Sequence, residues 1–216
     1  VKVRQVFLEA DSGVSVNRLV RFTLDQGYSG LEYFLGQPGS VGGAIWINVH
    51  NMRMGKFIGD FVASAKILNQ SNMLEEVSRD YFKFGYDYSI LHDTHDIVLE
   101  ATFKLIPKPK EEIEKTIAAN LAWRKEKHPE NATTTSAGSI FKKIEGYGAG
   151  RLIEKVGLKG HAIGGAKVSE KHANFIVNTG GAKAQDVRKL IVLIQQKVKE
   201  ELDLSLQTEI SFVGEF

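Results

Sequence analysis

The spacing of apolar residues along the first third of the chain predicts short strands and helices in alternation. Residues 1–9 are rich in Val and Phe and are typical of a strand. Residues 14–26 place apolar side chains at helical spacing and end at a glycine, which predicts an amphipathic helix. The apolar run 31–35 predicts another short strand, and it opens directly into the glycine-rich stretch 36–43.

The middle of the chain predicts a strand-rich region that ends at two prolines. Residues 61–68 and 96–106 read as strands. The Pro-Lys-Pro stretch 107–109 interrupts regular structure, so we expect a boundary there between a first domain, 1–106, and a second, 110–216.

The second domain is expected to mix helices with strands. Helices are predicted at 111–127, 149–156 and 185–201, and strands at 173–177 and 206–213. Together the two halves predict an α+β protein. In the last predicted strand, Glu209 falls on the face opposite Leu206 and Ile210, where an acid is most often solvated.

Composition narrows the function classes without choosing among them. The 28 basic and 26 acidic residues give a formal net charge of +2 with no long run of one sign, which does not favour a nucleic-acid or membrane-surface partner. There is no cysteine and no apolar run of membrane-spanning length, so a cytoplasmic, soluble protein is the default expectation.

Three stretches carry candidate chemistry. In the first, glycines around Ser40 free backbone N–H groups that could cradle a pyrophosphate, although many such loops are only tight turns. In the second, Gly138 permits backbone angles closed to other residues and could bring the Ser139 hydroxyl close to a ligand; Ser139 could equally be a turn or cap residue. The third holds His92 and His95 beside two aspartates, where we expect solvated side chains and no metal.

Several long blocks agree, in order and register, with one enzyme family. They are SAGSIFKK, AGRLIEKVGLKG and IGGAKVSEKHANFIVNTG, with GLEYFLGQPGSVGGAIWIN upstream and LQTEISFVGEF downstream. This pattern closely resembles the UDP-N-acetylenolpyruvoylglucosamine reductases, known as MurB, and covers essentially all 216 residues.

The resemblance implies a fold, an activity and a set of site residues. It implies a remnant of a PCMH-type FAD-binding domain followed by a MurB-type C-terminal substrate domain. The implied reaction uses FAD and NADPH to reduce UDP-N-acetylglucosamine enolpyruvate in peptidoglycan precursor synthesis, in a cytoplasmic monomer. The implied residues are Gly39, Ser40, Val41, Gly42 and Asn48 for FAD, Ser139 and Glu209 for catalysis, and Lys142 and Lys143 for the substrate diphosphate. For Asn48, a role as a buried hydrogen-bonding residue is the alternative.

The chain also departs from the family pattern. Asp87 stands where the family holds an active-site Arg, and Lys143 and Ile144 stand where it usually has Asn-Pro. Either another base, such as Lys83 or Arg53, supplies the missing cation, or the chemistry is weakened. The family's N-terminal Gly-Gly-Gly-Ser-Asn loop is absent, so we expect weak FAD binding or none. Two hypotheses follow: a truncated piece of a working reductase, or a non-catalytic flavin- or nucleotide-sugar-binding module.

Overall fold

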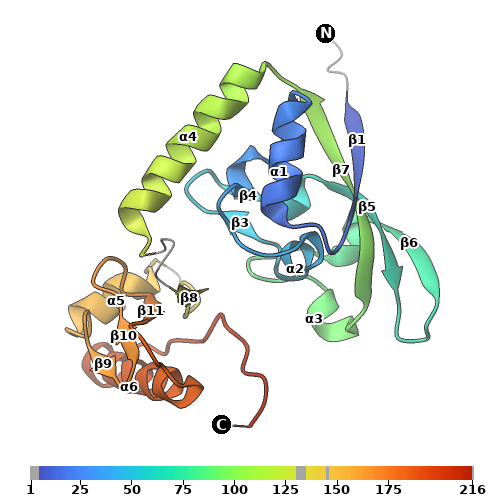
Figure 1. Cartoon of the computed structure of the whole chain (residues 1–216). Helices are drawn as coiled ribbons and strands as arrows, with labels where there is room; N and C mark the ends of the chain where they lie inside the picture. Colours follow the sequence, from blue (N-terminus) through green and yellow to red (C-terminus); the bar gives the residue numbers. More distant parts are fainter. Residues whose placement is uncertain (1–4, 130–134, 145, 216) are drawn as a thin grey trace. The chain divides into compact units, whose positions relative to one another are not determined.

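The structure is a computed structural model that describes the chain except for residues 1–4, 130–134, 145 and 216 (Figure 1). The chain divides into two compact units, Val1–Ala122 and Trp123–Phe216, each with its own hydrophobic core. Both units combine helices with antiparallel sheets, as the predicted α+β class requires.

The first unit is built on one antiparallel sheet. Its strand order is β1 (Val6–Asp11), β7 (Ile97–Pro107), β5 (Val62–Leu68) and β6 (Leu74–Ser78), and β2 (Tyr28–Ser29) pairs with the end of β7. The central strand β7 is paired along most of its length, opposite β1 on one side and β5 on the other. The predictions of strands at 61–68 and 96–106 are confirmed.

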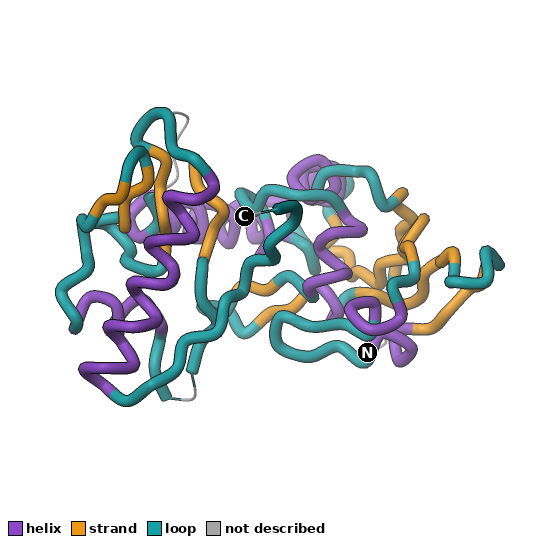
Figure 2. Tube along the Cα trace, turned by 90° about the horizontal axis from the view of Figure 1, so that it is seen from below, coloured by secondary structure: helices purple, strands orange, loops and turns teal. Residues whose placement is uncertain are grey.

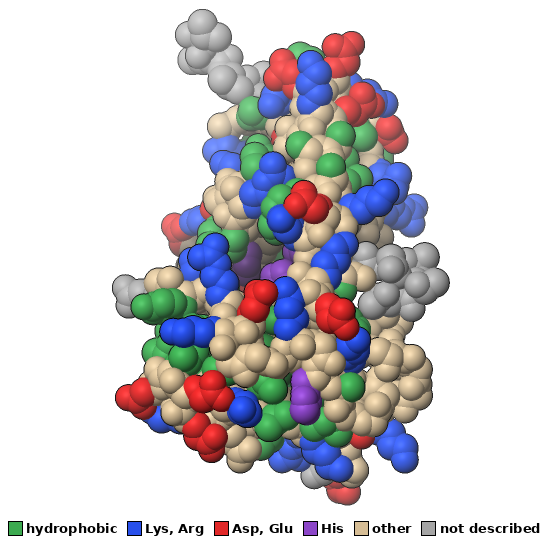
Figure 3. Space-filling model, turned by 90° about the vertical axis from the view of Figure 1, so that its left-hand side faces the viewer, with side chains coloured by type: hydrophobic (Ala, Val, Ile, Leu, Met, Phe, Trp, Pro, Cys, Tyr) green, Lys and Arg blue, Asp and Glu red, His purple; other side chains and the backbone are tan. Residues whose placement is uncertain are grey.

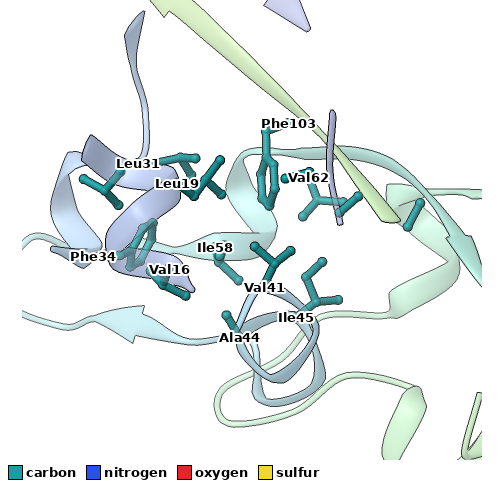
Figure 4. Packing of buried hydrophobic residues seen from close by; sticks show 14 of the residues in the cluster. Val16, Leu19, Leu31, Phe34, Val41, Ala44, Ile45, Ile58, Val62 and Phe103 are labelled. Carbon is teal, nitrogen blue, oxygen red and sulfur yellow. The ribbon is translucent and has the colours of Figure 1, made fainter. Parts of the chain in front are cut away.

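Two helices bury the apolar face of this sheet. Helix α1 (Val16–Asp25) begins at the Ser15 cap and α2 (Val41–Ile47) at the Ser40 cap, where each serine oxygen accepts a backbone N–H. Figure 4 shows their side chains packed with those of the sheet, among them Val16, Leu19, Val41, Ala44, Ile45, Val62 and Phe103. The smaller elements are η1 (Glu32–Phe34), β3 (His50–Asn51), β4 (Lys56–Phe57), η2 (Ile58–Asp60), η3 (Arg79–Phe82) and α3 (Leu91–Thr94).

Helix α4 (Lys110–Lys127) follows the two prolines, as predicted, but it belongs to both units. Ile113 and Ile117 in its first turns pack into the core of the first unit. The division between units therefore falls inside the helix, after Ala122, rather than at the prolines where the sequence placed it. Which unit serves the flavin and which the substrate stays a prediction.

The second unit packs helices on a four-stranded antiparallel sheet. The strand order is β8 (Thr135–Ser139), β11 (Phe175–Asn178), β10 (Ala166–Val168) and β9 (Ala162–Ile163), and the helices are α5 (Ala149–Lys155) and α6 (Ala184–Leu202). The predicted apolar face of α6 is buried, with Leu190, Ile191, Ile194 and Val198 in the core.

Two predicted strands are wrong. Residues 31–35 form a 3₁₀ turn because buried Glu32 accepts hydrogen bonds from the Ser29 hydroxyl and the Gly30 amide, both at 2.6 Å, and so closes the chain on itself. Residues 206–213 follow α6 as an irregular segment with a single bridge, between Thr208 and Phe141 (Figure 2). Apolar alternation in this segment marks Leu206 as buried, but it does not supply a neighbouring strand of matching length.

The surface carries both charge signs. On the face drawn in Figure 3, basic and acidic side chains alternate without a large area of one sign. Among the helices of the described residues, none is long and apolar enough to cross a membrane.

We predict that acid weakens the second unit through His128. Burial in an aromatic cluster with Trp123 and Phe175, helped by the positive charge of Arg124, lowers the pKa of His128 from 6.5 to about 4. Between these values the unfolded chain binds a proton that the folded chain excludes. The contribution of neutral His128 to the free energy of unfolding is therefore complete above about pH 6.5, and it falls as the pH decreases toward 4.

The measurement compares thermal midpoints at pH 7.5 and pH 5 for the wild type and for His128→Gln. His128→Gln should lose less stability between the two pH values, because Gln does not titrate. The control, His161→Gln, changes an exposed histidine of the same unit and should keep the wild-type difference. An unchanged pH difference in His128→Gln contradicts the assignment.

Candidate active site

A bulge at the end of β8 sets the position of Ser139. In the β8–β11 pairing, Ser136 is opposite Val177 and Ser139 is opposite Phe175, so β8 holds one more residue than its partner over this span. Gly138 lies in the bulge with φ of +81°, in the left-handed region that favours glycine, and its amide donates to the Ser136 hydroxyl. The predicted backbone freedom of Gly138 is confirmed.

The chain leaving Ser139 is joined to the C-terminal segment. The Glu209 amide donates to the Ile140 carbonyl at 2.8 Å, and the Lys142 amide donates to the Gln207 carbonyl at 2.9 Å. These two bonds flank the Phe141–Thr208 bridge. Three of the predicted site residues, Ser139, Lys142 and Glu209, are thus brought onto two adjoining backbone segments, although sixty or more residues separate Glu209 from the others in the sequence.

Asn174 fixes this arrangement. Its side-chain oxygen accepts from the Phe141 amide at 3.0 Å, its side-chain nitrogen donates to the Phe141 carbonyl at 2.9 Å, and its own carbonyl accepts from Ile140. The residue is only 7% exposed and immediately precedes β11. Sequence reasoning missed Asn174, because the strand predicted at 173–177 included it as an ordinary strand residue, whereas β11 begins after it.

Lys142 and Lys143 differ in their surroundings. Lys142 is half-buried and its backbone is part of the pairing with Gln207, whereas Lys143 is exposed. Ser139 and Glu209 are half-buried, so each side chain retains some access to a ligand.

The glycine-rich loop of the first unit donates most of its amides within the protein. The Val41 amide donates to Val14, the Gly42 amide to Ser12, and the Gly43 amide to the Ser40 hydroxyl oxygen. The expectation that successive amides of this loop point at one anion is therefore wrong for Val41 and Gly42. These two amides are held by the turn that precedes α1.

Asn48 ends α2 in the left-handed conformation and is buried. Its side-chain nitrogen donates to the Gly85 carbonyl at 2.7 Å and its oxygen accepts from the Gly59 amide at 3.0 Å. This geometry is that of a buried residue that satisfies backbone groups, and a flavin contact by Asn48 remains a prediction.

Asp87 lies in a tight turn between Gly85 and Tyr88 and is only 1% exposed. Its Oδ1 lies 3.2 Å from His50 Nδ1, and its Oδ2 has no hydrogen-bond partner within the described residues. The two cations proposed from sequence lie elsewhere: Arg53 donates to the Ala119 carbonyl, and Lys83 is exposed at the end of η3.

A cavity of about 230 Å³ opens beside this turn. Its lining combines aromatic rings with an arginine, an aspartate and an asparagine; the lining residues are Asn48, Phe57, Gly59, Asp60, Arg79, Phe84, Gly85 and Tyr86. The Arg79 Nε donates to the Gly59 carbonyl at 2.7 Å, so the guanidinium is anchored at the cavity wall.

His92 and His95 have structural neighbours. The His92 ring stacks on Trp46 at 3.7 Å between centroids, and the His95 carbonyl accepts from Gln70. Within the described residues, no group of three metal-ligating side chains comes together.

Comparison with known proteins identifies the family. The profile of the UDP-N-acetylenolpyruvoylglucosamine reductase C-terminal domain matches residues 128–213. A UDP-N-acetylenolpyruvoylglucosamine reductase of Listeria monocytogenes serotype 4b (strain CLIP80459) is 42% identical over 206 residues, which are 95% of this chain and 68% of the relative. One from Bacillus pumilus is 43% identical over 204 residues, 94% of this chain and 66% of the relative.

The fold agrees as well. The crystal structure of the reductase MurB from Thermus caldophilus superimposes with a TM-score of 0.83 at 36% identity, over 94% of this chain and 71% of that chain. The chain belongs to the UDP-N-acetylenolpyruvoylglucosamine reductase family. The relatives are oxidoreductases by name, and the resemblance noted in the sequence is thereby confirmed.

Two of this chain's departures from the MurB family pattern, Lys143 and Asp87, have different physical settings. Lys143 is exposed, where a change of side chain meets solvent. Asp87 is buried against His50, where a change of side chain must be matched by its surroundings. His50 carried no signal in the sequence, because a single histidine in a polar stretch is usually a solvated residue.

We predict that Asn174→Ala destabilises the second unit and displaces the Ser139 segment. The change leaves the buried amide and carbonyl of Phe141 without partners, at a cost of about 2–5 kcal/mol in the free energy of unfolding. The control is Asn178→Ala, which removes side-chain bonds to the amides of Gly180 and Ala182 at an exposed site. It should cost less, about 1 kcal/mol, because water can replace them.

Urea denaturation at neutral pH gives both free energies. Equal losses of unfolding free energy in the two variants would show that the buried bonds of Asn174 contribute no more stability than the exposed bonds of Asn178. Hydrogen exchange at the Phe141 amide provides a local readout, since only Asn174→Ala should accelerate it.

Proposed function

We propose that this chain is the substrate-binding and proton-donating part of a MurB-type reductase acting on UDP-N-acetylglucosamine enolpyruvate. The observation that carries the proposal is the joining of the Ser139–Lys142 segment to Glu209 through the Phe141–Thr208 bridge. It brings a hydroxyl, a carboxyl and a lysine onto adjacent segments of one unit. These are the residue types that the family's reduction needs.

FAD, when bound, would carry the hydride from NADPH to the enolpyruvyl double bond. The residues that could hold its pyrophosphate are Gly39 and Ser40, on an accessible turn before α2. The Ser40 oxygen accepts from Gly43, which leaves its O–H as a donor, and a Cβ added at Gly39 would meet no atom within 4 Å. The site can bind a phosphate with fewer donors than the sequence predicted, because the Val41 and Gly42 amides already donate within the protein.

Ser139 would supply the proton in the second half of the reaction. Addition of hydride to one carbon of the double bond leaves an enolate at the adjacent carbon, which takes up a proton to complete the saturated lactyl group. The bulge at Gly138 fixes the Ser139 backbone, so only the side-chain rotation of the hydroxyl remains to be set when the substrate binds.

Glu209 would stabilise the enolate. Its amide donates to the Ile140 carbonyl, one residue beyond Ser139, so the backbones that carry the acid and the hydroxyl lie on adjoining segments. A carboxyl that retains its proton can donate a hydrogen bond to the enolate oxygen as charge develops there. Lys142 and Lys143 would bind the diphosphate of the nucleotide sugar as point charges.

The alternative is a non-catalytic module that binds the nucleotide sugar or flavin. Asp87 favours it, because the family's cation at this position is replaced by an acid. Turnover distinguishes the two: NADPH oxidation that depends on UDP-N-acetylglucosamine enolpyruvate supports the reductase. Substrate binding with no turnover in the flavin-loaded protein, supplied with the N-terminal lobe of a relative, supports the module.

We predict that Ser139→Ala separates the two half-reactions. In the flavin-loaded protein, supplied with the N-terminal lobe of a relative, flavin reduction by NADPH should stay near the wild-type rate, because that step needs no proton at the substrate carbon. Reoxidation by the enolpyruvyl substrate should slow by roughly 10²–10⁴-fold, the usual loss for a positioned acid. Stopped-flow flavin absorbance measures both steps.

The control for this experiment is Ser205→Ala, an exposed serine in the segment after α6. It should change neither rate. If Ser139→Ala slows reduction by NADPH and leaves reoxidation untouched, the proton-donor role of Ser139 is wrong.

We predict a graded loss for Glu209→Gln and Glu209→Ala in the same reoxidation step. Gln keeps a hydrogen-bond donor at the site and should lose less than Ala, which keeps none. Equal rates in both variants and the wild type would remove Glu209 from the reaction. Hydrogen exchange at the Glu209 amide checks that its hydrogen bond to the Ile140 carbonyl persists, since a backbone bond should survive either change.

A further inference from the structure

The turn between β10 and β11 is closed by hydrogen bonds of its own. Ser169 is 4% exposed, and its hydroxyl oxygen accepts from the Lys171 amide at 3.1 Å and from the His172 amide at 3.3 Å. The Phe175 amide donates to the His172 carbonyl at 3.0 Å, and the Phe175 carbonyl accepts from the Ser169 amide at 2.8 Å. The backbone that carries His172 is therefore held in one conformation.

The side chain of His172 joins this turn to Asn174. Its Nδ1 accepts from the Asn174 amide at 3.2 Å. A ring nitrogen accepts a hydrogen bond only when it carries no proton, so this bond requires a neutral ring with its proton on Nε2. Protonation turns Nδ1 into a donor that faces another donor, the Asn174 amide, and the bond is lost.

The ring of His172 is packed on more than one side. It lies against Phe175, at 5.0 Å between centroids, and against His128, at 5.8 Å. A Cβ added at Gly150 in α5 would lie 3.1 Å from the His172 Cε1, so the helix backbone also comes close to the ring. This burial is the main cause that lowers the pKa of His172 from its usual 6.5.

The charged groups around the ring act in both directions. Lys159 lowers the pKa of His172 further, whereas the Glu154 carboxylate and the backbone of His172 itself raise it. The charged side chains of its own turn have other partners: Glu170 pairs with Lys167, and Lys171 donates to the Lys125 carbonyl.

The lowered pKa gives the sign of the pH dependence. The folded chain keeps His172 neutral at pH values where an unfolded chain has begun to protonate it. The bond from the Asn174 amide is therefore complete above about pH 6.5, and it is lost as the pH falls through the lower pKa of the folded chain.

We propose that His172 is a positioning residue of the candidate active site, and that its protonation loosens the segment that carries Ser139. His172 Nδ1 holds the amide of Asn174, whose side chain holds both the amide and the carbonyl of Phe141. The Phe141 segment follows Ser139 and pairs with the C-terminal segment. The effect on turnover rests on the proposed function, whereas the effect on the Phe141 segment does not.

Two variants separate the hydrogen-bond acceptor from the charge. His172→Asn places an amide oxygen near the position of Nδ1, so it keeps an acceptor for the Asn174 amide but does not titrate. His172→Leu fills the space and has no acceptor. The control, His161→Asn, changes an exposed histidine of the same unit. Thermal melts at each pH establish that every variant is folded.

Hydrogen exchange measured by NMR needs no substrate. The ring signals of His172, assigned by their absence from His172→Asn, report its protonation. As the ring is protonated, the protection factor of the wild-type Phe141 amide should fall about 10-fold, the range for one lost hydrogen bond. His172→Asn should keep the neutral-pH value throughout, His172→Leu should show the lower value already at pH 7.5, and His161→Asn should match the wild type. Wild-type protection of Phe141 in folded His172→Leu overturns the link between His172 and this segment.

Reoxidation of the flavin by UDP-N-acetylglucosamine enolpyruvate tests the effect on the site, in the flavin-loaded protein supplied with the N-terminal lobe of a relative. The wild-type rate should fall as His172 is protonated, and the fall should be smaller in His172→Asn. At pH 7.5, His172→Leu should be about 10- to 100-fold slower, because a small displacement of reacting groups is costly. Flavin reduction by NADPH should be the same in all four proteins at each pH.

The two measurements separate the failure of each idea. If the substrate does not reoxidise the flavin in the wild type, the proposed function fails for this chain, and exchange of the Phe141 amide still decides whether His172 holds the segment. If His172→Leu exposes the Phe141 amide but keeps the wild-type rate of reoxidation, the proposed function stands and the positioning role is rejected. Equal pH profiles of reoxidation in the wild type and His172→Asn reject the effect of protonation.

Discussion

The candidate active site depends on two hydrogen bonds, from the Phe141 amide to the Asn174 side-chain oxygen and from the Asn174 side-chain nitrogen to the Phe141 carbonyl. Because these bonds are buried, water cannot replace Asn174 as the partner of the Phe141 amide and carbonyl. The path of the segment that follows β8 is therefore fixed. With this path, the Ile140 carbonyl accepts from the Glu209 amide and the Lys142 amide donates to the Gln207 carbonyl. Glu209 is placed as a consequence of this pairing, without a regular strand to hold it.

The bulge in β8 and the Asn174–Phe141 hydrogen bonds constrain successive points of the same segment. Gly138 adds a residue to β8 and so sets where Ser139 lies, and Asn174 then fixes the direction of the chain beyond it. The buried side chains of Ile140 and Phe141 anchor the segment in the core of the second unit. The backbone that carries the Ser139 hydroxyl is thus fixed by packing, by a bulge and by hydrogen bonds together.

The sequence predicted the elements whose apolar residues recur regularly. Helices α1, α4 and α6 and strands β5 and β7 follow apolar periodicity, and Gly138 was recognised because only its backbone angle was at issue. The strand predicted at 31–35 failed on a local contact, the hydrogen bonds of Glu32 with Ser29 and Gly30, and the other failures depend on partners distant in the chain. Residues 206–213 needed a strand beside them, the amides of the glycine-rich loop found acceptors before α1, and Asn174 gained its role only from Phe141. Periodicity carries no information about such partners.

The two departures from the family pattern bear differently on the choice between a reductase and a diverged module. A solvated position such as Lys143 can change without affecting the fold, so its identity says little about selection. A buried acid is different, because leaving it without a charge partner costs stability. Asp87 lies in a tight turn, with Oδ1 at 3.2 Å from His50 Nδ1 and Oδ2 without a hydrogen-bond partner among the described residues. The buried acid is therefore only partly compensated, and Asp87 rather than Lys143 is the departure that bears on the choice between the reductase and the module.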